Sequence, residues 1–93
     1  MFEWDERKAT INFAKHNVSF EEALTIFDDP NAFDALALVH HEPRRLRLGM
    51  SAAGRVLTVV YTLRRSESGE ATRIISARPA NRIEKFGYAG TQD

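Results

Sequence analysis

The sequence predicts an α+β fold in which two N-terminal helices pack on an antiparallel sheet of about four to five strands, followed by a closing C-terminal helix. Two patterns predict it. Helix-start signals and a 3.6-residue apolar period fill residues 5–29, and a two-residue period follows from residue 31. A chain of 93 residues has the size of one small domain, so we expect residues 1–93 to fold as a unit.

A short strand and a helix open the chain. Phe2–Trp4 has the alternation of a short strand, and Asp5 then fits the N-cap of a helix over residues 6–16. Asn17 ends this helix, because asparagine tolerates the left-handed backbone conformation of a helix terminus.

The second helix carries the clearest local signals. Ser19 and Glu22 have the spacing of a capping box, and Asp28-Asp29-Pro30 stops the helix because proline disfavours helical geometry just before it. Four apolar residues between these signals have the i, i+3, i+4, i+7 spacing of a core-facing surface: Phe20, Ala23, Leu24 and Phe27.

The following segments alternate in the manner of strands. Within residues 45–50 the leucines and Met50 face one way and the arginines face the other. Residues 56–63 are β-branched and apolar on both faces, as in a central strand. Strands are expected over residues 32–38, 45–50, 56–63 and 72–77, with a loop at His40-His41-Glu42-Pro43 and turns at residues 51–54 and 65–70.

A helix closes the predicted domain. Pro79 fits its first position, Ile83 and Phe86 are expected to face inward, and Gly87 and Gly90 end it. Both N-terminal helices should cover one face of the sheet, which leaves the other face partly open. We expect function on that open, arginine-bearing face.

Several classes of site are excluded by composition. The chain has no cysteine, which removes disulfides, thiolate zinc sites and thiol nucleophiles. His40-His41 fits a solvated loop better than a chelate, because adjacent residues of an extended chain point in different directions. The glycines match no nucleotide-binding motif. We therefore expect no metal and no cofactor.

The ends and apolar runs of the chain indicate its compartment. The acidic N-terminus lacks the layout of a signal peptide, and no apolar run reaches the length of a membrane span. We therefore expect a cytoplasmic protein without membrane contact.

The net charge of zero conceals an asymmetry between the two halves. Residues 1–43 contain three basic and nine acidic side chains, whereas residues 44–93 contain ten basic and four acidic ones. A basic half favours binding to a polyanion. The alternative is that the predicted helices are simply acidic and the strands basic.

Arginines on or next to the predicted strands supply the candidate chemistry. The planar guanidinium fork matches phosphate oxygens, and fixed cations stabilise the charge that develops when a ribose 2′-hydroxyl attacks the adjacent phosphorus. The alternative is that they protect strand edges from aggregation. These residues are Arg44, Arg45, Arg47, Arg64, Arg65, Arg73, Arg78 and Arg82.

Two other side chains each allow two interpretations. His16 at the end of the first helix fits either a favourable interaction with the helix dipole or a role in catalysis and RNA contact. Tyr88 near the chain end fits either a core-covering residue or a surface on which a base stacks.

An ordered series of landmarks runs through nearly the whole chain. Phe2-Glu3-Trp4-Asp5 precedes Lys8, Asn12 and the segment Lys15–Ala23, and Asp28-Asp29-Pro30 comes next. Further landmarks lie at residues 59–62, 74–78 and 80–88. This series resembles the BrnT family of ribonuclease toxins.

The resemblance implies a fold, an activity and partners. It implies a RelE-like fold, RNA cleavage that inhibits translation, and neutralisation by a BrnA-type antitoxin. The toxin and antitoxin would form a complex, of possible higher order, that represses the operon encoding both proteins. The antitoxin would supply the DNA contact of this complex. The resemblance places functional basic residues at Arg47, Arg64 and Arg78, which we predict to be catalytic. As substrate-binding residues we predict Arg82, His16 and Tyr88.

Two positions depart from the family pattern. Asn17 replaces the usual glycine, which asparagine can match in conformation, and Met50 stands where a basic residue is frequent. With the zero net charge, these departures leave open a non-catalytic partner or co-repressor that acts only with the DNA-binding antitoxin. A third alternative, direct DNA binding, lacks a helix-turn-helix pattern.

Overall fold

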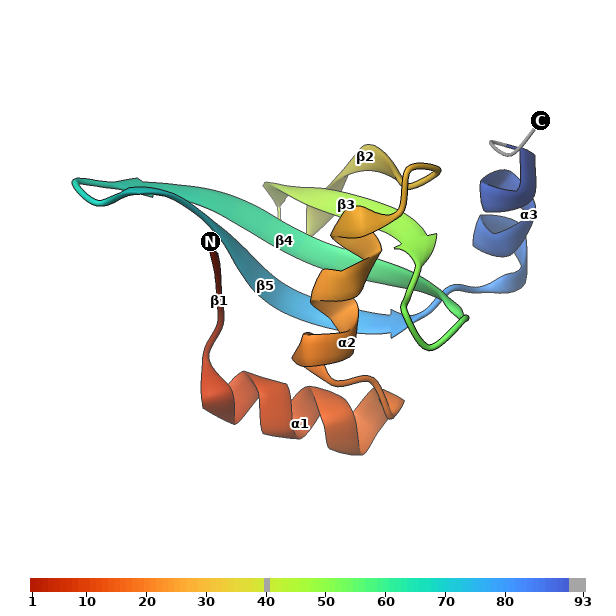
Figure 1. Cartoon of the computed structure of the whole chain (residues 1–93), viewed down its shortest axis with the longest axis horizontal. Coiled ribbons are helices and arrows are strands. Elements are labelled where there is room, and N and C mark those ends of the chain that lie inside the picture. The colour runs from red at the N-terminus through yellow and green to blue at the C-terminus, as the bar shows by residue number, and fades with distance from the viewer. Residues whose placement is uncertain (40, 91–93) are drawn as a thin grey trace.

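The computed structural model describes residues 1–39 and 41–90 and has the predicted α+β architecture (Figure 1). One mixed sheet has the strand order β1-β5-β4-β3-β2. Two α-helices and a 3-10 helix (η1) precede β2, and one α-helix closes the chain. The elements are β1 Phe2–Glu3, α1 Glu6–His16, α2 Phe20–Leu24, η1 Thr25–Asp28, β2 Phe33–Val39, β3 Glu42–Met50, β4 Val56–Ser66, β5 Gly69–Pro79 and α3 Arg82–Gly90.

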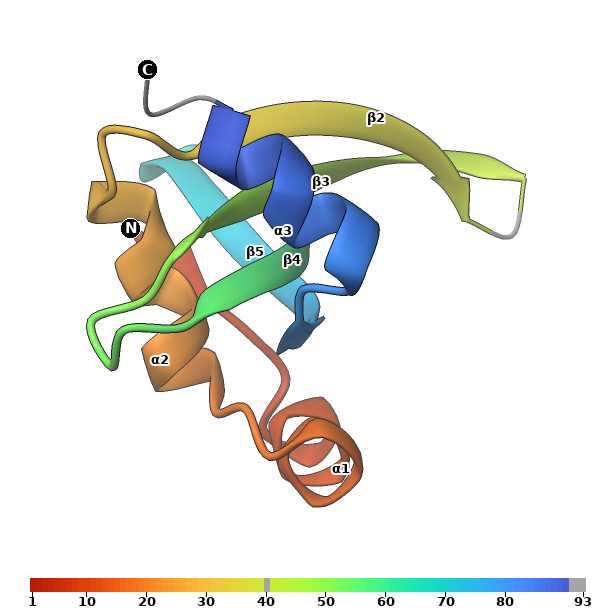
Figure 2. The ribbon, with the colours of Figure 1, turned by 90° about the vertical axis from the view of Figure 1, so that its right-hand side faces the viewer.

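The helices lie on opposite sides of the sheet. Helices α1 and α2 cover one face, and α3 lies over β3 and β4 on the other (Figure 2). The sheet departs from the expected antiparallel one in a single place, because β1 pairs in parallel with β5 through Phe2↔Thr72 and Glu3↔Arg73. The remaining neighbours are antiparallel. We call the α3 side of the sheet the open face.

Helix α1 begins and ends as predicted. The Asp5 carboxylate accepts hydrogen bonds from the backbone amides of Arg7 (2.8 Å) and Lys8 (3.4 Å). Asn17 adopts the left-handed conformation at φ 56°, and its amide donates to the Phe13 carbonyl at 2.8 Å. The replacement of glycine by asparagine therefore preserves the helix end.

Helix α2 is shorter than its apolar spacing predicts. Ser19 Oγ accepts from the Glu22 amide at 3.0 Å, but the Glu22 carboxylate binds Arg55 and Ser51 instead of completing the capping box. The backbone tightens to 3-10 geometry at Thr25 and changes which side chains face the sheet. Ile26 is consequently fully buried, whereas Phe27 is only partly buried.

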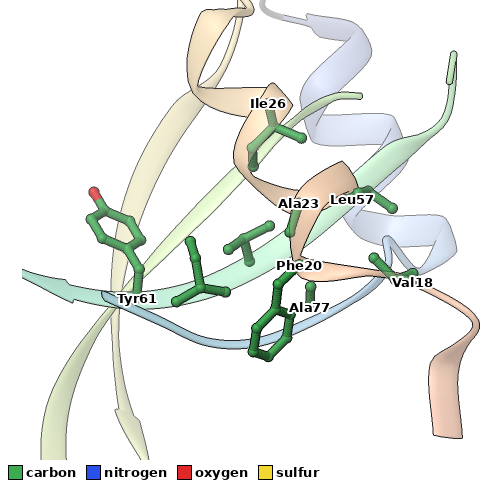
Figure 3. Packing of buried hydrophobic residues seen from close by; sticks show 9 residues of the cluster. Val18, Phe20, Ala23, Ile26, Leu57, Tyr61 and Ala77 are labelled. Atoms are coloured by element: carbon green, nitrogen blue, oxygen red, sulfur yellow. The ribbon is translucent and has the colours of Figure 1, made fainter. Parts of the chain in front are cut away.

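The hydrophobic core lies between the sheet and α2 (Figure 3). Phe20, Ile26, Leu57 and Ile74 are its largest fully buried apolar side chains. Asn12 of α1 is one of three buried polar side chains among the described residues, together with Ser51 and Thr58. Its amide nitrogen donates to the carbonyls of Ala77 (2.8 Å) and Val18 (3.0 Å), and its oxygen accepts from the Ala77 amide (3.1 Å). The Asn12 side chain thus satisfies the backbone carbonyl and amide of Ala77, which lie on the part of the β5 edge that β1 does not pair with.

The strand limits correct two predictions. Strand β3 already begins at Glu42, so Glu42 and Pro43 belong to a strand and not to the predicted loop. His40 of the expected histidine pair lies outside the described residues, and His41 has a positive φ of 65°. Strands β4 and β5 extend to Ser66 and from Gly69, which shortens the second turn.

The closing helix α3 corrects two further predictions. Pro79 ends β5 and does not start a helix, because α3 begins after Asn81. Asn81 and Glu84 exchange two hydrogen bonds of 2.8 Å, the reciprocal pattern of a capping box. Ile83 and Phe86 were predicted to face inward, but they are 83% and 84% exposed. The inward positions are one helical turn apart, at Glu84 and Tyr88.

Candidate functional site

The strand register separates the three arginines predicted to be catalytic. Residues opposite one another in an antiparallel pair share a face of the sheet. Arg47 of β3 is opposite Val59 of β4, and Val59 is opposite Ala77 of β5. Val59 and Ala77 are fully buried on the face covered by α1 and α2, so Arg47 lies on that face as well. Arg78 is opposite Thr58 and lies on the open face. Arg47 and Arg78 therefore cannot grip one phosphate.

Arg47 belongs to a local cluster at the rim of the core. Its Nε and Nη2 donate to the two Asp34 oxygens at 2.6 and 2.9 Å, and its guanidinium lies 4.5 Å from the Phe27 ring centroid. The Tyr61 hydroxyl also donates to Asp34, at 2.8 Å. The hydrogen bonds from Arg47 lower the pKa of the Asp34 carboxyl, although burial opposes this. Arg47 is thus committed to a structural ion pair.

Arg78 forms the central contact of the open face. Its Nη1 and Nη2 donate to the two oxygens of Glu84 at 2.7 and 2.9 Å, which ties β5 to α3. Thr58 Oγ1 on β4 donates to the same carboxylate at 3.0 Å. The hydrogen bonds from Arg78 are the main cause that lowers the pKa of Glu84 to about 2. We call Arg78, Glu84 and Thr58 the open-face triad.

Arg64 occupies the far end of the same face. On β4 it lies six residues beyond Thr58, a separation of ~20 Å along a strand. Its Nη1 is 3.6 Å from a Glu3 oxygen, and Arg73 binds the same oxygen at 2.8 Å. The Arg64 side chain is 61% exposed. The open face therefore carries two separate arginine clusters and not one.

The predicted substrate-binding residues lie in three different environments. Arg82 is exposed in the first turn of α3, and its side chain forms no ion pair with residues 1–39 or 41–90. His16 lines a groove between α1 and β5, together with Lys8, Lys15 and Ser76.

Tyr88 is the third of these residues, and it is buried with 3% of its surface exposed. Its hydroxyl donates to Asp29 at 2.5 Å, and burial with this bond raises the pKa of Tyr88 to about 12. In this structure Tyr88 covers the core, the first of the two interpretations, and offers no free ring face for a base.

Several contacts of the site were absent from the sequence prediction. Glu84 and Asp34, the carboxylates that bind Arg78 and Arg47, were not predicted, and neither was the Arg73 pair. Glu84 has a local signal, because Asn81-Arg82-Ile83-Glu84 has capping-box spacing. Asp34 has no local signal, because its contact with Arg47 depends on the register of two strands.

The described residues contain neither a metal-binding cluster nor a membrane-spanning helix. Among the described residues, no group of three or more His, Cys, Asp or Glu side chains is placed to hold a metal ion. None of the helices in residues 1–39 and 41–90 has the length and apolar character needed to cross a membrane.

Comparison with known proteins identifies the family. A family model described as the ribonuclease toxin BrnT of type II toxin-antitoxin systems matches residues 4–84. A sequence comparison with curated proteins finds no match. The family match runs from Trp4 to Glu84 and so includes all three strand arginines and the open-face triad. Because it covers most of the chain, this protein belongs to the BrnT family of ribonuclease toxins of type II toxin–antitoxin systems.

Proposed function

We propose that this toxin is a cytoplasmic, metal-independent endoribonuclease that inhibits translation and is neutralised by a BrnA-type antitoxin. The observation that carries the proposal is the position of Arg78. Its guanidinium lies on the face of the sheet that α1 and α2 leave uncovered, and 40% of its side chain is exposed. The guanidinium fork has the geometry to bind two phosphate oxygens once Glu84 releases it.

The proposed chemistry needs only the RNA and a fixed cation. The ribose 2′-oxygen forms a bond to the adjacent phosphorus as the bond from phosphorus to the 5′-oxygen breaks. The 2′-hydroxyl proton passes to solvent, and the leaving 5′-oxygen takes a proton from solvent. Arg78 stabilises the additional negative charge on the phosphoryl oxygens. The products are a 2′,3′-cyclic phosphate and a 5′-hydroxyl.

The other predicted residues take revised roles in this proposal. Arg64, Arg82 and His16 are assigned to RNA contact, because they lie on the open face or at accessible edges. Arg47 and Tyr88 are assigned to folding, because each is engaged with a carboxylate near the core. A phosphate reaching Arg78 must compete with Glu84, so α3 regulates access to the cation.

The test measures cleavage by the purified chain in the presence of a chelator. We expect cyclic phosphate ends with or without EDTA, and a loss of about 10²–10³ in rate for Arg78→Lys and Arg78→Ala. Arg65→Ala is the control, because Arg65 is 85% exposed near the tip of the β4–β5 hairpin. Equal rates for wild type, Arg78→Ala and the control, with unchanged melting temperatures, would reject Arg78 as the catalytic cation.

A second function is favoured by one specific observation. Arg47, Arg64 and Arg78 each lie within 4 Å of a carboxylate oxygen of this chain, so none of them is an uncommitted cation. The alternative is a non-catalytic partner that acts only in complex with a DNA-binding antitoxin and contacts DNA indirectly. It predicts tight antitoxin binding with no cyclic phosphate ends from the separated toxin.

A further inference from the structure

The groove between α1 and the exposed edge of β5 combines basic, polar and apolar side chains. It has a volume of about 210 Å³. Strand β1 pairs only with Thr72 and Arg73, so the β5 edge beyond Arg73 forms no ladder with another described strand. The lining residues are Lys8, Ile11, Asn12, Lys15, His16, Ile75 and Ser76.

The charge of this groove distinguishes it from others on the molecule. Lys8, Lys15 and His16 line it, and no carboxylate does. Three further grooves of the described chain contain the acidic pairs Glu6 and Glu21, Asp28 and Asp29, and Glu3 and Glu70, respectively. The two lysine ammonium groups of the α1–β5 groove therefore make it suited to an anion.

Neither lysine is held in an ion pair among the described residues, although the charge of Lys8 acts on the nearby Asp5 carboxyl. Unlike Arg47, Arg64 and Arg78, neither Lys8 nor Lys15 forms an ion pair with residues 1–39 or 41–90. Both are exposed on α1, two helical turns apart, which is ~10 Å along the axis. At that spacing each ammonium group can take a different phosphate of one strand, without first breaking an internal salt bridge.

The remaining lining residues suit the sugar and base of a nucleotide. Ile11 and Ile75 offer apolar surface, and His16 is a ring of the kind on which unstacked bases lie. The β-bulge around Ile75 leaves backbone polar groups at this edge outside the regular ladder. The volume is below the ~300–1,000 Å³ of pockets for drug-sized ligands, so it fits part of one nucleotide.

The groove also connects to the open face. Ser76 lines it and, two positions before Arg78 on β5, points to the same side of the sheet. We propose that the α1–β5 groove is a binding track for single-stranded RNA, with Lys8 and Lys15 on its phosphates, that leads the strand toward Arg78. This inference rests on the proposed ribonuclease function and names the surface that holds its substrate.

The test uses a fluorescent 2′-O-methyl oligoribonucleotide, which binds as RNA does but cannot be cleaved through its 2′-oxygen. Anisotropy is measured over a salt series for wild type and for Lys8→Ala/Lys15→Ala. Each phosphate contact on a single strand contributes ~0.7 to the salt slope. We therefore expect the double variant to bind roughly tenfold more weakly at low salt and to lose about 1.4 from the slope.

Two controls separate a track from general attraction. Arg7→Ala/Arg65→Ala removes the same charge from exposed positions outside the groove and should bind almost as wild type does. Lys8→Arg/Lys15→Arg should restore binding. Equal weakening in both double alanine variants would overturn the proposal, as would RNA binding that is unchanged in Lys8→Ala/Lys15→Ala while antitoxin binding is lost.

A cleavage assay distinguishes failure of the track from failure of the ribonuclease function. Loss of contacts made equally in the bound and transition states raises KM and leaves kcat unchanged. We expect that split for Lys8→Ala/Lys15→Ala and a reduced kcat for Arg78→Lys. If the wild type cleaves RNA but the two double alanine variants bind RNA with equal affinity, the binding track is rejected and the ribonuclease function stands. If the wild type binds RNA through Lys8 and Lys15 but does not cleave it, the ribonuclease function is rejected and the binding track stands.

Discussion

Glu84 of α3 holds Arg78 of β5 through two hydrogen bonds of 2.7 and 2.9 Å, so one carboxylate both docks the closing helix and occupies the candidate catalytic cation. The same carboxylate accepts from Thr58 and from the amide of Asn81. Its removal therefore affects folding and the site together. This coupling gives the ion pair a measurable pH signature.

Acid should weaken the protein through Glu84. Its pKa is about 2 in the folded state against an ordinary value of 4.5, so the unfolded chain binds the proton more readily. The stabilisation is present above pH 4.5 and is lost as the pH falls toward 2. We expect the difference in free energy of unfolding between wild type and Glu84→Gln to be large at pH 7 and to shrink by pH 3, as measured with urea.

The control for this prediction is an exposed carboxylate. Glu67 lies in the β4–β5 turn, and its side chain forms no ion pair with the described part of the chain. Glu67→Gln should differ little from wild type at either pH. A gap between wild type and Glu84→Gln that stays constant from pH 7 to pH 3 would contradict the assigned ionisation of Glu84.

Substitution of Arg47 should affect stability and leave cleavage intact. Arg47→Ala removes two hydrogen bonds from Asp34 and the contact with the Phe27 ring. Because Asp34 is about one-third exposed, water compensates part of the loss, and we expect a destabilisation of about 1–3 kcal/mol. Urea denaturation and the cleavage assay are measured on the same samples. Reduced kcat with unchanged stability would return Arg47 to the active site.

Local signals predicted the parts of the fold that depend on few residues. Asp5 and Asn17 bound α1 as expected, because a cap depends only on the adjacent backbone. The alternation in β3 correctly put Arg45 and Arg47 on one face and the leucines on the other. It could not indicate which face the helices cover, so the sequence left open whether Arg47 shares a face with Arg64 and Arg78.

Long-range packing decided what the sequence left unresolved. Ile83 and Phe86 are more hydrophobic than Glu84, yet they face outward because α3 docks through polar contacts with Arg78 and Asp29. Hydrophobicity alone therefore selects the wrong side of this helix. The sequence predicted that arginines would supply the candidate site. It did not predict which arginines lie together, because that depends on strand register and on the carboxylate that each arginine binds.

The bond between Tyr88 and Asp29 should stabilise the closing helix. Asp29 also accepts from the amides of Met50 and Asn31, and these bonds, despite burial, keep the pKa of its carboxyl below the ordinary value. Tyr88→Phe should lower the free energy of unfolding by about 1–2 kcal/mol at pH 7, because it removes one hydrogen bond to a charged acceptor. Urea denaturation measures this loss.

The alkaline limb of stability gives an independent check on Tyr88. Its folded pKa of about 12 exceeds the ordinary value of 10, so its stabilisation is complete below pH 10 and is lost as the pH rises through 12. The gap between wild type and Tyr88→Phe should therefore close at high pH. A gap that widens there would contradict the hydrogen bond as its source.

Two glycines should respond oppositely to alanine. A Cβ on Gly49 would lie 3.0 Å from the Ala32 Cβ and 3.1 Å from the Ile26 Cβ, inside the core, whereas a Cβ on Gly87 would meet nothing within 4 Å. Gly49→Ala should cost about 1–3 kcal/mol through overpacking, and Gly87→Ala should add about 0.5–1 kcal/mol by favouring the helix. Thermal and urea unfolding measure both. Destabilisation by Gly87→Ala would show that the outer face of α3 is already closely packed in the free protein.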